Sequence, residues 1–101
     1  MEYKILNTGI KPIVIQEICE LAQNYNVDKV ILFGSRSRGD YKRVSDIDLA
    51  VSGGNFVRFA VDVDEETSTL LKFDLVNLDG SVQEELRAAI EKEGKILYEK
   101  I

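Results

Sequence analysis

Apolar positions near the N-terminus recur with the spacing of an α-helix. The side chains that line one helical face are Ile15, Ile18, Cys19 and Ala22. Pro12 suits the first turn of such a helix, so we expect a helix over residues 11–25. Its single cysteine lies on the apolar stripe, which indicates a small buried core residue rather than a reactive thiol.

Short apolar, β-branched segments further along the chain are typical of strands. They cover residues 29–33, 46–51 and 70–77. Residues 55–67 fit two patterns, because Val57, Phe59, Val61 and Val63 alternate while Phe56, Phe59, Ala60 and Val63 share a helical face. The length and the acidic end of this segment favour a helix.

The C-terminal part of the chain carries helix start and stop signals. Ser81 followed by Glu84 is a capping-box pattern, and Gly94 stands where a helix would end. The apolar face between them comprises Val82, Leu86, Ala89 and Ile90. A short extended tail over residues 95–99 follows. The elements together predict an α+β (α/β-like) fold with helices packed on a small sheet.

Composition narrows the class of protein. With 101 residues, 45% hydrophobic and 31% charged, we expect a single folded domain over residues 1–101. The longest apolar run, residues 30–33, is far shorter than a membrane span, and the N-terminal residues 1–9 lack the pattern of a signal peptide. A single cysteine indicates a reducing, cytoplasmic setting.

Missing residue types also narrow the chemistry. The chain has no histidine and one cysteine, which excludes Ser-His triads, His-ligated zinc sites and thiolate metal sites. Carboxylate chemistry with a hard cation such as Mg²⁺ remains. The net charge of -5 argues against direct nucleic-acid binding by a basic face.

Three aspartates stand on predicted strands. Asp46 and Asp48 lie two residues apart, so they project from one face, about 6.5 Å apart along the strand, and could share a cation. Asp74 interrupts an apolar strand in the same way and would join them if the two strands are neighbours. The alternative for each is a polar residue on a solvated strand.

A basic turn precedes the aspartate pair. Gly34 and Ser35 follow a strand and would expose backbone N–H groups and a hydroxyl, which bind phosphate oxygens. The nearby cations are Arg36, Arg38, Lys42 and Arg43, four of the 13 in the chain. A basic turn with no ligand is the alternative. Together with the acids, the turn predicts a site for a polyphosphate and Mg²⁺, suited to phosphoryl or nucleotidyl transfer.

The G-S-x-x-x-G motif at residues 34–39, the S-D-x-D-L motif at residues 45–49 and Asp74 resemble the nucleotidyltransferase superfamily of DNA polymerase beta. More closely they resemble its minimal nucleotidyltransferase family, often encoded beside HEPN-domain toxins. The resemblance covers essentially the whole chain and implies the polymerase beta-like nucleotidyltransferase fold, a small mixed β-sheet with helices packed on it.

The resemblance also implies a role for each motif residue. Gly34 and Ser35 would hold the β- and γ-phosphates of ATP, and Arg36 and Arg38 would contact phosphate. Asp46 and Asp48 would bind Mg²⁺. Asp74 would be the third acid of the metal and catalytic set, placed to take a proton from the acceptor hydroxyl.

Three functions follow from this resemblance. The first is transfer of AMP from ATP to a hydroxyl of a HEPN toxin, with the chain as antitoxin. The second is a non-catalytic module that neutralises its partner by stoichiometric contact. The third is nucleotidyl transfer to a small molecule or an RNA end, against which the short chain argues, since larger relatives carry acceptor domains. The acceptor, the base preference and homo-oligomerisation stay open.

Overall fold

A computed structural model describes residues 7–101 of the chain. Part of the N-terminal segment for which no signal peptide is expected, residues 1–6, lies outside the described residues. The elements in chain order are α1 (Pro12–Asn24), β1 (Lys29–Phe33), α2 (Ser35–Arg38), β2 (Ile47–Ser52), α3 (Phe56–Glu66), β3 (Phe73–Asn77), α4 (Glu84–Glu93) and β4 (Lys95–Glu99).

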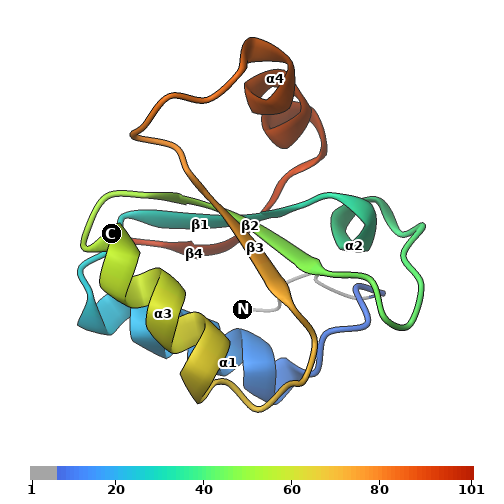
Figure 1. Cartoon of the computed structure of the whole chain (residues 1–101), viewed down its shortest axis with the longest axis horizontal. Helices are drawn as coiled ribbons and strands as arrows, with labels where there is room; N and C mark the ends of the chain where they lie inside the picture. The colour runs from blue at the N-terminus through green and yellow to red at the C-terminus, as the bar shows by residue number, and fades with distance from the viewer. Residues whose placement is uncertain (1–6) are drawn as a thin grey trace.

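The strands form one mixed sheet in the order β3-β2-β1-β4 (Figure 1). β1 pairs antiparallel with both β2 and β4, whereas β2 and β3 run parallel. The parallel pair is connected through α3, as a crossover requires. The expected small mixed sheet with packed helices is therefore confirmed, and the extended tail over residues 95–99 is its fourth strand.

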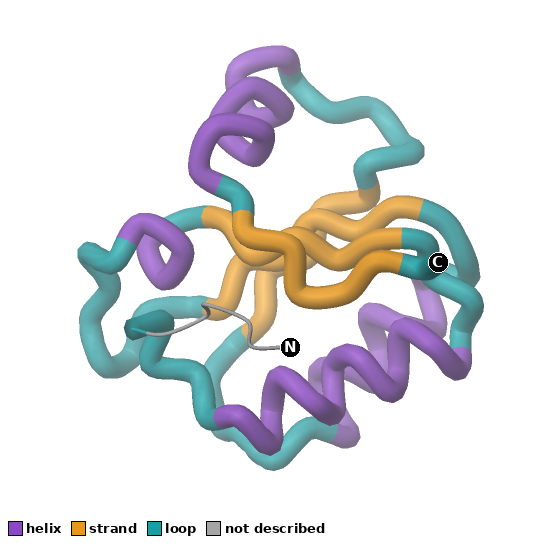
Figure 2. The backbone as a smooth tube through the Cα atoms, turned by 180° about the vertical axis from the view of Figure 1, so that it is seen from behind, coloured by secondary structure: helices purple, strands orange, loops and turns teal. Residues whose placement is uncertain are grey.

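Helices cover the two faces of the sheet unequally. α1 and α3 pack side by side on one face, and α4 stands on the other (Figures 1 and 2). Alternation along β2 explains both layers: Ile47, Leu49 and Val51 join the core with the two helices, while Ala50 meets Ile90 of α4. α4 packs on this face, and Asp48, which alternates with the core residues of β2, lies on the same face.

The ambiguous segment over residues 55–67 is a helix. Its Asn55 side chain accepts a hydrogen bond from the Arg58 N–H at 3.2 Å, a regular N-cap. Phe59 and Val63 are fully buried, whereas Val57 and Val61 are exposed. The apparent alternation of valines is thus a consequence of helical residues on two different faces.

Two details of the sequence-based interpretation were wrong. The capping box at Ser81 does not form: α4 begins at Glu84, its N-cap is Gln83, and no side chain caps it. The third strand begins at Phe73 rather than at residue 70, and Leu70 is fully exposed. In the described part of the chain, no helix has the length and apolar character needed to cross a bilayer.

Gly94 ends α4 as expected, but for a steric reason. Its φ is −67°, outside the left-handed region, and its N–H donates to the Ile90 carbonyl at 2.8 Å. A Cβ at this position would collide with that carbonyl and with the Ile31 side chain on β1. The close approach fixes the end of α4, and therefore Glu93, against the sheet.

Candidate active site

The expectation that Asp74 joins the other acids if the two strands are neighbours is met for Asp48. The parallel register sets Asp48 of β2 directly beside Asp74 of β3. Paired residues on adjacent strands project from the same face, and these two share the α4 face with Ala50 and Val76. Asp46 lies two residues ahead of Asp48, immediately before β2, and is exposed.

The Gly34 turn lies against this acid pair. Phe33, the last residue of β1, is opposite Asp48 in the antiparallel register, so the turn begins beside the Asp48 carboxylate. Gly34 has a φ of 77°, and a Cβ there would overlap the Asp48 carboxylate. Glycine is therefore required both for the backbone conformation and for the close approach. Ser35 follows as the first residue of α2.

The environment of Asp48 disfavours its negative charge. Burial, then the charges of Asp74 and Asp46, raise the pKa of Asp48 from 3.8 to about 6, and Arg38 opposes the shift. The acids are thus close enough to influence one another. A cation beside them would relieve this repulsion.

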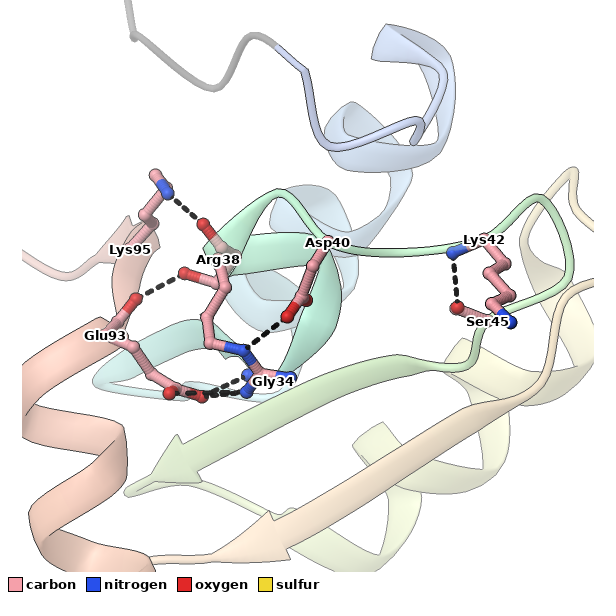
Figure 3. Close-up of polar contacts among 8 residues, drawn as sticks. Gly34, Arg38, Asp40, Lys42, Ser45, Glu93 and Lys95 are labelled. Carbon is pink, nitrogen blue, oxygen red and sulfur yellow. Dashed lines mark hydrogen bonds and ion pairs between the residues drawn. The ribbon is translucent and has the colours of Figure 1, made fainter.

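Arg38, the last residue of α2, is paired with two carboxylates. Its guanidinium is 3.3 Å from Asp40 and 3.1 Å from Glu93 (Figure 3). These hydrogen bonds, led by that to Asp40, raise the pKa of Arg38. The Arg38 side chain is 47% exposed, so an anion can reach it.

Arg36 has a different environment from the one expected of a phosphate contact. Its side chain is 2% exposed, and its N–H groups donate to the carbonyls of Thr8, Lys42, Arg43 and Ser45 at 2.8–3.4 Å. The guanidinium also stacks on the Tyr41 ring, 4.9 Å from its centroid. We infer that Arg36 fixes the loop ahead of Asp46, because carbonyls of that loop and of Thr8 accept from its N–H groups.

Glu93 is the site residue that sequence reasoning missed. Its carboxylate accepts a hydrogen bond from the Gly34 N–H at 2.7 Å, although 59 positions separate the two residues (Figure 3). No motif marks it in the sequence, where it is one of several acids on α4. Cys19 agrees with its predicted core role: burial raises the pKa of its thiol, which donates to the Leu97 carbonyl at 3.3 Å.

The donor set of the site consists of carboxylate oxygens, which suit Mg²⁺. Within residues 7–101, no three Asp, Glu, Cys or His side chains are already gathered closely enough to hold a metal ion. The arrangement nevertheless combines an acid pair in register, an exposed third acid and a turn that carries the Ser35 hydroxyl and the partly exposed Arg38 guanidinium. Such a set is chemically able to bind a metal–polyphosphate.

The buried position of Arg36 predicts a stability effect. Arg36→Lys keeps the charge but loses the planar fork, so several of the four carbonyls lose their donor. We expect the free energy of unfolding to fall by about 2–4 kcal/mol, measured by urea denaturation. Arg43→Lys, in an exposed side chain, is the matched control and should change it by less than about 0.5 kcal/mol. Equal stability of the two variants would contradict the structural role.

The raised pKa of Asp48 predicts a pH-dependent effect. The folded state holds the Asp48 proton more tightly than the unfolded state, so stability falls as pH rises from 3.8 to about 6. Asp48→Asn should therefore raise the free energy of unfolding at pH 7.5 by about 1 kcal/mol, a value reduced for solvent screening, in metal-free buffer. The gain should vanish near pH 3.5.

The measurement is urea denaturation at both pH values. Asp64→Asn is the charge-matched control, because Asp64 is exposed on α3, on the opposite side of the sheet. A loss of stability at pH 7.5 in Asp48→Asn would contradict the electrostatic interpretation.

Known proteins resemble the chain in both sequence and structure. Residues 16–101 match the family described as Polymerase beta, Nucleotidyltransferase. A curated relative, "Putative protein adenylyltransferase MJ0604" of Methanocaldococcus jannaschii, is 35% identical over 82 residues, covering 71% of this chain and 79% of the relative.

Solved structures share the fold. A crystal structure described as the toxin-antitoxin with AMP-PNP has a TM-score of 0.69 and 26% identity, over 85% of this chain and 73% of that one. A mutant of the toxin-antitoxin MntA-HpeT has a TM-score of 0.64 and 27% identity, over 84% and 72% of the two chains. With motif, fold and acid geometry in agreement, the predicted resemblance is confirmed: the chain belongs to the polymerase beta nucleotidyltransferase family.

Proposed function

We propose that this nucleotidyltransferase is Mg²⁺-dependent and moves AMP from ATP to a hydroxyl group of a partner protein. The observation that carries the proposal is the register of Asp48 beside Asp74, next to the Gly34 turn. It brings candidate metal ligands and candidate hydrogen-bond donors for phosphate to the same end of the sheet. The relative named as a protein adenylyltransferase supports AMP as the group and protein as the acceptor.

The three acids would hold the metal. Asp46, Asp48 and Asp74 supply carboxylate oxygens, the ligands that Mg²⁺ prefers. Bound Mg²⁺ would neutralise phosphate charge. Because the pKa of Asp48 is about 6, proton and metal would compete for it, and metal affinity should fall below that pH.

The transfer itself needs phosphate positioning and a base. Gly34, Ser35 and Arg38 would hold the β- and γ-phosphates. The acceptor oxygen bonds to the α-phosphorus while the bond from that phosphorus to the oxygen bridging the β-phosphate breaks. Pyrophosphate leaves with the electron pair of that bond, and the proton of the hydroxyl passes to the Asp74 carboxylate, which is exposed for this contact.

The partner is proposed to be a HEPN-domain toxin, with this chain as its antitoxin. The solved toxin-antitoxin structures with the same fold support a toxin partner. A hollow of about 480 Å³ adjoins Asp46 and is lined otherwise by Val44, Leu70, Leu71 and Lys72. Its exposed apolar side chains suit a protein segment that brings a hydroxyl towards the acids.

Labelling with α-³²P-ATP tests this function. The purified chain, Mg²⁺ and the protein encoded by the neighbouring gene should give a labelled partner. Asp74→Asn should lower the transfer rate by about 10²-fold or more, because the base and a metal ligand are lost. Asp64→Asn on α3 should transfer at the normal rate.

Two results would contradict the proposal. One is the absence of label on the partner with well-folded wild-type chain. The other is a chain with both Asp46 and Asp48 changed to Asn that still neutralises the toxin in cells at normal expression, which would favour stoichiometric binding. Label on an RNA end or a small molecule without partner would instead identify another acceptor.

A further inference from the structure

The Glu93 carboxylate accepts hydrogen bonds from two groups that are proposed to bind the triphosphate. Its carboxylate is 2.7 Å from the Gly34 N and 3.1 Å from Nη1 of Arg38. Both donors belong to the proposed phosphate site. Its side chain is 19% exposed, whereas the Asp40 side chain, which shares Arg38, is 64% exposed. The carboxylate is thus a partly buried anion that accepts from the donors proposed to hold phosphate.

Contacts of its neighbours hold Glu93 in this place. The Ser37 hydroxyl donates to the Glu93 carbonyl, and the Lys95 ammonium donates to the Ser37 carbonyl (Figure 3). Together with the close approach of Gly94 to β1, these bonds attach the end of α4 to α2. The main chain at Glu93 is therefore fixed by the fold, which keeps its carboxylate within reach of the turn.

The charge of the Glu93 carboxylate weakens the attraction of the turn for an anion such as triphosphate. Glu93 and Asp40 together offset the cation of Arg38, the exposed guanidinium of the turn. Glu93 also adds negative charge beside Asp48. A triphosphate that approaches Gly34 and Arg38 must therefore displace one carboxylate and tolerate its repulsion.

We propose that Glu93 is an internal anion that competes with the triphosphate for Gly34 and Arg38, and so sets the affinity of the site for nucleotide. This inference rests on the proposed function of the turn. Binding then requires the Glu93 side chain to turn away, while its main chain stays attached to Ser37. Glu93 acts as a positioning residue, since it controls access to the turn and does not touch the reacting atoms.

Calorimetric titration of inorganic triphosphate without metal tests this directly. Glu93→Gln removes the charge but keeps an oxygen that can accept from the Gly34 N–H. We expect binding to tighten about five- to tenfold, and the gain to shrink as salt increases. Glu91→Gln makes the same change of net charge at an exposed position of α4, and should change binding less than about twofold.

The outcomes separate this inference from the proposed function. Tight binding by wild type with equal or weaker binding by Glu93→Gln would overturn the inference alone. No binding by either protein would overturn the phosphate site and the inference together. Glu93→Ala serves as a second variant, expected to bind more tightly than wild type, and loss of the fold in both variants would make Glu93 purely structural and overturn the inference.

Discussion

The site depends on the close approach of the Gly34 main chain to the Asp48 carboxylate. The antiparallel register fixes Phe33 opposite Asp48, so the chain must turn where the carboxylate already stands. Only a residue without a Cβ fits, and the positive φ imposes the same requirement. Because β3 is in parallel register with β2, this single contact also places the turn relative to Asp74. Short, rigid strand ends, rather than long loops, align the two halves of the site.

The close approach also explains the charge balance of the site. Burial beside the main chain and the charges of two other acids raise the pKa of Asp48 to about 6. The positive charge of Arg38 is offset by the carboxylates of Asp40 and Glu93. Repulsion among the acids favours a cation beside them, and the Glu93 carboxylate accepts from the donors of the turn. If a metal–polyphosphate binds here as proposed, its cation would reduce the repulsion among the acids and its anion would replace the carboxylate at the turn, so that each would support binding of the other.

Sequence reasoning succeeded where local geometry decides position. Strand alternation placed Asp48 and Asp74 on predictable faces, and their pairing needed only that β2 and β3 be neighbours. It failed where the hydrogen-bond partners of a side chain are distant in the sequence. Arg36 is buried because carbonyls of Thr8 and of the loop before Asp46 surround it, and composition alone predicts an exposed arginine. The contact of Glu93 with Gly34 likewise exists only in the folded chain.

Arg36 is buried and Arg38 is partly exposed because both lie on the single helical turn α2. Residues two apart on an α-helix point about 200° away from each other, so when one side chain enters the protein the other leaves it. Arg36 enters and satisfies main-chain carbonyls, and Arg38 leaves and stays exposed beside Gly34. A basic motif of this spacing therefore divides its cations between one that holds the loop from inside and one that stays accessible at the surface. Counting them all as phosphate contacts overestimates the positive charge that a nucleotide meets.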